Sequence, residues 1–187
     1  MEEEKIDING LVLMKPSIFN DERGAFFESY NKLKYDTLID GPIDFMQDNI
    51  SISKKNVLRG LHFQKRPMAQ GKLVQVIKGS VLDVAVDIRK NSPTYGQHYK
   101  VELNDVNKFQ LWIPEGFAHG FLSLEEDTIF SYKCTNLYSK ENEMAFLWND
   151  PLLNIDWGIE SPVLSTKDNL AMNFRDFNSP FKNLSIF

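Results

Sequence analysis

The sequence is poor in the residues that build disulfides and metal centres. Its 187 residues include one cysteine, Cys134, so an internal disulfide is excluded. The three histidines, His62, His98 and His119, form no His-x-His pair and no close Cys/His cluster. We therefore expect no metal, although a barrel could still gather His62, His119 and a carboxylate. A Gly-rich dinucleotide fingerprint is missing too, which argues against a redox cofactor.

Long basic runs and long apolar runs are also missing. The net charge is −5, and nucleic-acid affinity comes mainly from Lys and Arg against phosphate, so we expect no nucleic-acid partner. No apolar run approaches the roughly 20 residues that cross a bilayer. The acidic start, MEEEKIDING, is unlike a secretory signal. These features predict a soluble, cytoplasmic protein without a membrane partner, in which a few arginines could hold a small anion.

Apolar and aromatic side chains are plentiful, at 42% and 12% of the chain. The length fits a single domain over 1–187. Short segments that alternate with a period of two predict an all-β fold, with a jelly-roll barrel favoured. Helices are expected only at 30–39 and 167–176. Strands are expected at 11–14, 25–29, 48–52, 57–63, 73–77, 81–88, 100–103, 110–113, 119–123 and 128–135.

The clearest alternation lies in KLVQVIKGSVLDVAVDIR (72–89). Two apolar runs flank the letters KGS, which predicts a β-hairpin with Gly79 in the turn. In the second run, the apolar residues at 84, 86 and 88 share one face and the aspartates at 83 and 87 share the other. The aspartate face is expected to meet either water or a polar cavity.

The segment VLRGLHFQ (57–64) places Arg59 and His62 in an apolar strand. A histidine there is commonly a hydrogen-bonded core residue. An arginine keeps its charge inside a protein, so a buried one needs an anion, either a carboxylate or a ligand. Regular alternation would send the two side chains to opposite faces. We predict a distortion at or next to Gly60 that turns both into one cavity.

A second histidine context is LWIPEGFAHGF (111–121), where His119 lies between Ala118 and Gly120. Small neighbours let a ligand approach the imidazole closely. The ordinary structural explanation is a tight barrel corner, in which Gly116 and Gly120 serve backbone geometry. Both explanations can hold together.

Four other polar residues have ordinary structural explanations, and three of them have a functional explanation as well. Lys72 either caps a strand or offers a cation to a developing oxyanion. Tyr132 and Tyr138 flank Cys134, a packing residue, and each tyrosine is either a core-edge residue, a general acid or a stacking surface. Asp168, in LSTKDN, taken alone fits a helix N-cap.

Two earlier segments carry further polar groups. DERGAFFES (21–29) holds Arg23 and Glu28 around an aromatic pair, and its ordinary explanation is an exposed turn and an edge strand. Gln47, Asp48 and Asn49 offer amide and carboxylate groups. Such groups could read a pyrimidine edge or merely shape a turn.

Taken together, these motifs are far more specific than any one of them alone. In chain order they are FNDERGAFFE (19–28), QDNIS (47–51), VLRGLHFQ (57–64), QGKLV (70–74), DVAVDIR (83–89), SPTYG (92–96), WIPEGFAHGF (112–121), YKCTNLY (132–138), WNDP (148–151) and STKD (165–168). From about Gly10 to Asp168, this set closely resembles the dTDP-4-dehydrorhamnose 3,5-epimerase family.

The resemblance implies a cupin-type jelly-roll barrel, or double-stranded β-helix, with a few short helices. It implies a homodimer that uses no metal or cofactor, in which a segment at about 10–30 reaches the partner's site. The implied reaction, a step of dTDP-L-rhamnose biosynthesis, converts dTDP-4-dehydro-6-deoxy-D-glucose, a dTDP-linked 4-keto-6-deoxy sugar, to dTDP-4-dehydro-L-rhamnose.

The resemblance also implies residue roles, one position at a time. His62 would be the base, Asp168 its carboxylate partner and Tyr132 the acid. Lys72 and His119 would contact the sugar, and the positive charge of Lys72 would also take part in catalysis. Tyr138 would stack on thymine. The remaining nucleotide-binding positions would be Arg23, Glu28, Gln47, Asp48, Asn49, Arg59, Glu143 and Lys167.

The implied chemistry suits these residue types. Removing a proton beside a ketone needs a base poised near neutral pH, and histidine supplies one. A carboxylate on its second nitrogen fixes the tautomer, so we expect Asp168 within hydrogen-bonding reach of His62. A 3- or 5-mono-epimerase, a 3,4-ketoisomerase, a metal-dependent cupin oxygenase and a catalytically silent sugar-nucleotide sensor remain as alternatives.

Overall fold

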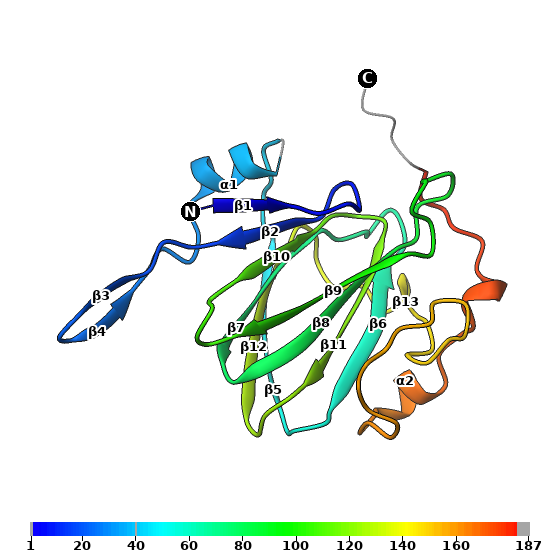
Figure 1. Ribbon diagram of the computed structural model, residues 1–187. Coiled ribbons are helices and arrows are strands. Elements are labelled where there is room, and N and C mark those ends of the chain that lie inside the picture. Colours follow the sequence, from blue (N-terminus) through cyan, green and yellow to red (C-terminus); the bar gives the residue numbers. More distant parts are fainter. Residues whose placement is uncertain (1, 40, 183–187) are drawn as a thin grey trace.

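Two antiparallel sheets make up the body of the protein in the computed structural model (Figure 1). The structure describes residues 2–39 and 41–182. In spatial order, the six-stranded sheet consists of β1 (Glu2–Lys5), β2 (Val12–Lys15), β10 (Gln110–Ile113), β7 (Lys72–Lys78), β12 (Thr128–Cys134) and β5 (Gln47–Ser53). The five-stranded sheet consists of β13 (Glu143–Ala145), β6 (Leu58–Gln64), β11 (Phe117–Ser123), β8 (Ser80–Asp87) and β9 (His98–Asn104).

The remaining elements are short. Strands β3 (Phe19–Asp21) and β4 (Gly24–Phe26) form a separate hairpin that projects away from the two sheets (Figure 1). The helices are α1 (Lys32–Leu38), α2 (Thr166–Asn169) and the 3-10 turn η1 (Phe174–Asp176). In the described ranges, none of them is long and apolar enough to cross a membrane.

The predicted all-β jelly roll is confirmed. Nearly every expected strand is present, with its ends shifted by a residue or two. The segment expected at 25–29 is strand only over Gly24–Phe26, and the helical segment at 167–176 is divided into α2 and η1. Alternation identified the strands of the two sheets because each of those predicted has at least one face packed against other residues, whereas β4 is exposed at every position.

The predicted hairpin at 72–89 is wrong. Strand β7 pairs with β10 and β12 in one sheet, whereas β8 pairs with β11 and β9 in the other. At Gly79, with φ of +84°, the chain passes from one sheet to the other. A Cβ on Gly79 would lie 2.6 Å from Thr128 Oγ1, so the corner has room for glycine only.

Apolar side chains fill three layers, one between the sheets and one outside each. The layer between the sheets includes Val74 and Phe130 from one sheet and Ala85 and Phe121 from the other. The C-terminal segment covers the outer face of the five-stranded sheet. Strand β8 is thus buried on both faces, and Asp83 and Asp87 are fully buried rather than facing water.

The third layer covers the outer face of the six-stranded sheet. There Tyr35 of α1 packs with Met14, Leu73 and Trp112, and the loop after α1 adds Phe45. This layer holds the segment that follows the β3–β4 hairpin against the barrel.

Strand β6 is distorted at Gly60, as predicted. Two steps along β11, from His119 to Phe121, match three steps along β6, from His62 to Arg59. Gly60 has φ of +137°, and a Cβ on it would lie 2.5 Å from the Cα of Gly120. The extra residue breaks the alternation and brings Arg59 and His62 to the same cavity.

Edge strand β5 has the reverse of the usual polarity. Its burial alternates, and the exposed positions include Ile50 and Ile52, whose exposed fractions are 69% and 65%. Its polar residues Gln47, Asn49 and Ser51 line cavities inside the barrel. An apolar outward face at a sheet edge is typical of a surface that meets another protein surface.

We predict that Gly60→Ala will destabilise the protein more than Gly24→Ala. Both glycines have strongly positive φ, +137° and +127°, but no atom lies within 4 Å of a Cβ at Gly24. Backbone strain alone costs about 1–3 kcal/mol, and Gly60→Ala adds the collision with Gly120. Thermal unfolding of both variants measures the difference. Equal losses would contradict the importance of the Gly60–Gly120 contact.

Candidate active site

A histidine and a carboxylate from distant parts of the chain form the centre of the site. His62 Nε2 lies 2.5 Å from Asp168 Oδ1, with the two side chains 26% and 4% exposed. The predicted contact is therefore confirmed. The N-cap of α2 is Ser165, whose hydroxyl accepts from the Asp168 backbone N–H, so Asp168 is not the cap. Its carboxylate is left for the imidazole.

The carboxylate of Asp168 stays ionised at neutral pH. Burial raises its pKa, but the hydrogen bond and charge of His62 and the hydrogen bond from Ser165 outweigh burial and leave the pKa below its usual value. An ionised carboxylate at Nε2 favours the imidazole tautomer that carries its proton there. The nitrogen left for a substrate proton is then Nδ1.

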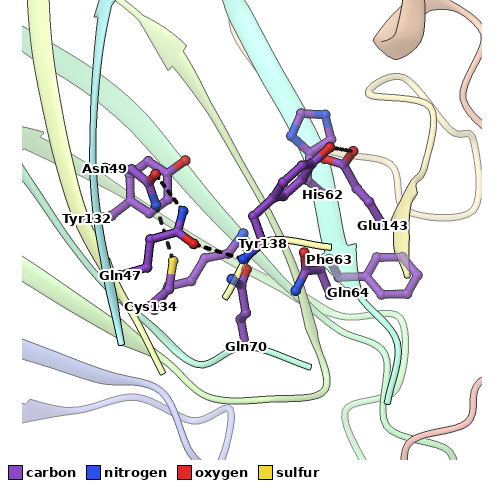
Figure 2. A pocket seen from close by; sticks show the side chains of 11 residues that line it. Gln47, Asn49, His62, Phe63, Gln64, Gln70, Tyr132, Cys134, Tyr138 and Glu143 are labelled. Carbon is purple, nitrogen blue, oxygen red and sulfur yellow. Dashed lines mark hydrogen bonds between the residues drawn. The ribbon is translucent and has the colours of Figure 1, made fainter. Parts of the chain in front are cut away.

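Two adjoining cavities share this centre, and His62, Lys72 and Tyr132 line both. The first cavity, of about 260 Å³, appears in Figure 2. Its other lining residues are Gln47, Asn49, Phe63, Gln64, Gln70, Cys134, Tyr138 and Glu143. The second cavity, of about 300 Å³, is also lined by Ser51, Arg59, His119, Phe121, Phe130, Ser165, Lys167 and Asp168.

The three shared residues come from opposite sheets. His62 lies on β6 of the five-stranded sheet, while Lys72 and Tyr132 lie on β7 and β12 of the six-stranded sheet. Figure 2 shows Tyr132 and His62 projecting from separate ribbons. A flat ligand held between the sheets would meet a base on one face and a proton donor on the other.

Burial sets the protonation of Lys72 and Tyr132. It lowers the pKa of the Lys72 ammonium, although nearby charges, including that of Asp83, act in the opposite direction. It raises the pKa of the Tyr132 phenol, which keeps its proton at neutral pH. The site thus offers a phenolic proton from Tyr132. It also offers an ammonium group on Lys72, which burial makes easier to deprotonate.

A second imidazole–carboxylate pair lies beside the first. His119 Nε2 is 2.9 Å from Asp83 Oδ2, and both residues are buried. Burial lowers the pKa of His119, so its imidazole is neutral at neutral pH, although Asp83 acts in the opposite direction. His119 then presents a hydrogen-bonding group rather than a charge to the second cavity.

Two buried side-chain atoms within residues 2–39 and 41–182 lack a hydrogen-bond partner, and both lie at this site. They are Asp83 Oδ1, next to His119, and Ser51 Oγ, in the wall of the second cavity. Buried polar atoms are normally paired. A polar ligand in the second cavity would supply the hydrogen bond that Ser51 lacks.

A chain of hydrogen bonds shapes the first cavity (Figure 2). Gln47 donates to Asn49 Oδ1 at 2.8 Å and accepts from the backbone N–H of Tyr138 at 2.8 Å. The Tyr138 hydroxyl donates to Glu143 at 3.0 Å, and Lys167 pairs with the same carboxylate at 2.5 Å. Tyr138, which is half-exposed, is thus held at its backbone by Gln47 and at its hydroxyl by Glu143.

Arg59 differs from its prediction because it is exposed rather than buried. Its Nε donates to Ser53 Oγ at 3.1 Å, and its side chain lines the second cavity. The guanidinium therefore needs no internal carboxylate, since water or a ligand can meet its charge.

Three predicted nucleotide-binding residues lie away from both cavities. Asp48 points outward from β5 and pairs with Lys133 at 3.0 Å, because strand alternation turns it opposite to Gln47 and Asn49. Asp48 therefore reaches neither cavity of its own chain, and its role in nucleotide binding stays a prediction. Arg23 pairs with Asp21 in the β3–β4 hairpin, and Glu28 pairs with Lys34.

The sequence-based prediction missed several lining residues. Ser51 follows Asn49 with a spacing of two, so alternation along β5 would have found it. Gln70 reaches the first cavity from a loop, and Phe121 and Phe130 line the second. No local signal distinguishes these two rings from core residues.

Among the described residues, no three His, Cys, Asp or Glu side chains form a group that could hold a metal ion. Each of the two histidines at the site is engaged by a single carboxylate instead.

Comparisons with known proteins identify the family to which the chain is similar. The family model described as dTDP-4-dehydrorhamnose 3,5-epimerase matches residues 5–176. The epimerase of that name from Salmonella typhimurium is 55% identical over 168 residues, which cover 89% of this chain and 92% of that protein.

Solved structures agree with the sequence match. The crystal structure of the epimerase from Elizabethkingia anophelis is 48% identical, with a TM-score of 0.91 over 96% of this chain and 99% of that one. The enzyme from Legionella pneumophila, solved in complex with dTDP-4-keto-L-rhamnose, is 46% identical, with a TM-score of 0.91 over 95% and 94% of the two chains. The chain belongs to the dTDP-4-dehydrorhamnose 3,5-epimerase family.

Proposed function

We propose that the protein inverts carbons 3 and 5 of dTDP-4-dehydro-6-deoxy-D-glucose to give dTDP-4-dehydro-L-rhamnose. The observation that carries this proposal is the arrangement of four residues around one cavity. His62, paired with Asp168, lies on the side of the five-stranded sheet, and Lys72 and Tyr132 lie on the side of the six-stranded sheet. An epimerase needs a base and an acid on opposite faces of one carbon. The names of the relatives support the same reaction.

Each inversion has two proton transfers. His62 Nδ1 takes the proton from the carbon beside the ketone, and the C–H electron pair becomes the enolate double bond, with negative charge on the carbon 4 oxygen. Asp168 stabilises the imidazolium, and the Lys72 ammonium stabilises the oxygen. The Tyr132 hydroxyl then protonates the same carbon from the opposite face, and the enolate returns to the ketone. Exchange with water resets both residues.

The nucleotide would lie along the outer parts of the cavities. Tyr138 offers an aromatic face to thymine, with Gln47 and Asn49 beside it to hydrogen bond with the base edge. Arg59 and Lys167 line the second cavity and supply cations for the diphosphate. Glu143 holds Lys167 and Tyr138 in place.

We further propose that two copies of the chain form a dimer in which each completes the other's site. We call residues 16–29 the arm, and it contains the β3–β4 hairpin. This hairpin projects from the sheets, and its aromatic residues Phe19 and Phe26 are 65% and 71% exposed (Figure 1). Together with the apolar outer face of β5, they form surface suited to a partner. Arg23 and Glu28 would thereby reach the partner's nucleotide.

The single domain over 1–187, the cytoplasmic location and the independence from cofactors and nucleic acid stay predictions. Met1, Asp40 and residues 183–187 of that domain lie outside the described residues.

Proton exchange in deuterium oxide tests the reaction. The protein should incorporate deuterium at carbons 3 and 5 of the dTDP 4-keto sugar, as NMR would report. His62→Ala should lower the exchange rate by about 10²–10⁴, the usual contribution of a general base, while dTDP binding persists. His98→Ala, on β9 outside both cavities, is the matched control and should exchange normally.

Other outcomes of this experiment identify other functions. Exchange at one carbon only would indicate a mono-epimerase, and a product with a moved carbonyl would indicate a ketoisomerase. Binding of the dTDP sugar by the wild type without any exchange would leave a sensor. Activity that requires stoichiometric iron would indicate a metal-dependent enzyme.

The loss of activity at alkaline pH should follow the deprotonation of the Lys72 ammonium. Burial lowers the pKa of its ammonium below the ordinary 10.5, so activity is lost as pH rises through that lowered value. Tyr132 deprotonates later, because burial raises its pKa. Lys72→Arg should move this loss to higher pH even if kcat falls, since a guanidinium keeps its proton. Lys78→Arg, exposed on the same strand, is the control. An unmoved alkaline limb of the pH–rate profile in Lys72→Arg would contradict the role of Lys72.

Charging the outer face of β5 should dissociate the dimer. Ile50→Glu combined with Ile52→Glu places two carboxylates in the proposed interface, where their desolvation is unfavourable. Sedimentation velocity should show a monomer. Steady-state kinetics should show a raised KM, because the partner's arm is lost. Val106→Glu alters an even more exposed apolar residue elsewhere and should remain dimeric. A dimeric Ile50/Ile52 variant would exclude this face from the interface.

A further inference from the structure

A buried polar network lies at the root of the arm. Gln110 of β10 and Tyr35 of α1 are both buried, and they lie in the apolar layer outside the six-stranded sheet. An amide in such a layer is unusual, because a leucine or methionine would fill the space without needing partners. The network therefore calls for an explanation beyond packing.

The hydrogen bonds of this network converge on one carbonyl of the arm. Gln110 Nε2 donates to the backbone oxygen of Ser29 at 2.9 Å and to Gln75 Oε1 at 2.8 Å. The Tyr35 hydroxyl lies 2.5 Å from Gln110 Oε1 and 3.0 Å from the same Ser29 oxygen. Burial raises the pKa of Tyr35, so its hydroxyl remains a donor throughout the neutral range.

Gln110 touches both ends of the arm. Its backbone pairs with Met14 in β2, two residues before the arm begins. Its side chain binds Ser29, where the arm ends. The segments that lead into and out of the hairpin are thus both bound to one buried residue of the barrel.

The length of the arm makes its root angle important. From Ser29 to Arg23 an extended chain spans roughly 20 Å, so a tilt of about 10° at the root moves the tip by about 3 Å. A hydrogen bond to a ligand is lost over a smaller displacement than that. Hydrogen bonds fix an angle better than apolar packing does, because they are directional.

We infer that Gln110 and Tyr35 are positioning residues that set the direction of the arm and thereby deliver Arg23 and Glu28 to the nucleotide bound by the partner copy. This inference rests on the proposed function, in which the arm crosses the dimer. The two residues touch no substrate. They act on substrate binding through the arm and leave the proton transfers at His62 and Tyr132 unchanged.

Steady-state kinetics with the dTDP 4-keto sugar tests this assignment. Gln110→Met keeps the length of the side chain and removes its hydrogen bonds, and Tyr35→Phe removes one hydroxyl from the same network. Each variant should raise KM by about 3- to 10-fold, the effect of one or two hydrogen bonds, with kcat within about twofold of wild type. Tyr35→Phe keeps the test available if Gln110→Met fails to fold.

A double-mutant cycle separates arm positioning from general destabilisation. If Gln110 acts through Arg23, Gln110→Met should add little to the KM of Arg23→Ala. A structural defect would instead raise KM by the same factor in both backgrounds. Thr128→Val removes another buried hydroxyl, bonded to Glu125 O and remote from the arm, and should lower the melting temperature without changing KM.

The possible failures are distinguishable. A raised KM in Arg23→Ala with a wild-type KM in both Gln110→Met and Tyr35→Phe would overturn the positioning role alone. So would full additivity in the cycle, or a fall in kcat without a change in KM. A wild-type KM in Arg23→Ala would overturn the part of the proposed function that assigns the arm to the partner's nucleotide, and the positioning role with it.

Discussion

The contact between Gly60 and Gly120 is the constraint on which the site depends. The two backbones approach so closely that a Cβ on Gly60 would lie 2.5 Å from the Cα of Gly120. That approach accommodates the extra residue in β6, and the extra residue turns Arg59 and His62 toward one cavity. In a regular strand the two would face apart. His62, the proposed base, and Arg59, which is proposed to bind phosphate, therefore share a cavity because the backbones of two glycines can approach each other closely.

The two sheets divide the proposed chemistry between them. The five-stranded sheet carries both imidazoles, and buried or nearly buried carboxylates, Asp168 and Asp83, hold each of them. The six-stranded sheet carries the cation and the phenol, Lys72 and Tyr132. A ring between the sheets meets opposite groups on its two faces. The proposed inversion needs that arrangement, and the positions of the two sheets supply it.

The surface features of the chain fit a site that a second copy completes. Strand β5 places amides and a serine inside the barrel and isoleucines outside, so a single strand shapes both the cavity and an apolar outer face. The arm has exposed aromatic residues and is held at its root by a buried amide. In this proposal, substrate affinity depends on residues such as Gln110 that never approach the substrate.

Alternation, which is a local pattern, located every strand except β1, β3 and β13. The sequence also predicted a distortion at Gly60, because an arginine and a histidine three residues apart could not otherwise share a face. It predicted the wrong partner for β8, and it did not show that Arg59 is exposed or that Asp48 points away from both cavities. These points are settled by the folded protein. Which strands pair, which side chains reach a cavity and which charges meet water depend on contacts between residues far apart in the chain, and no local pattern records them.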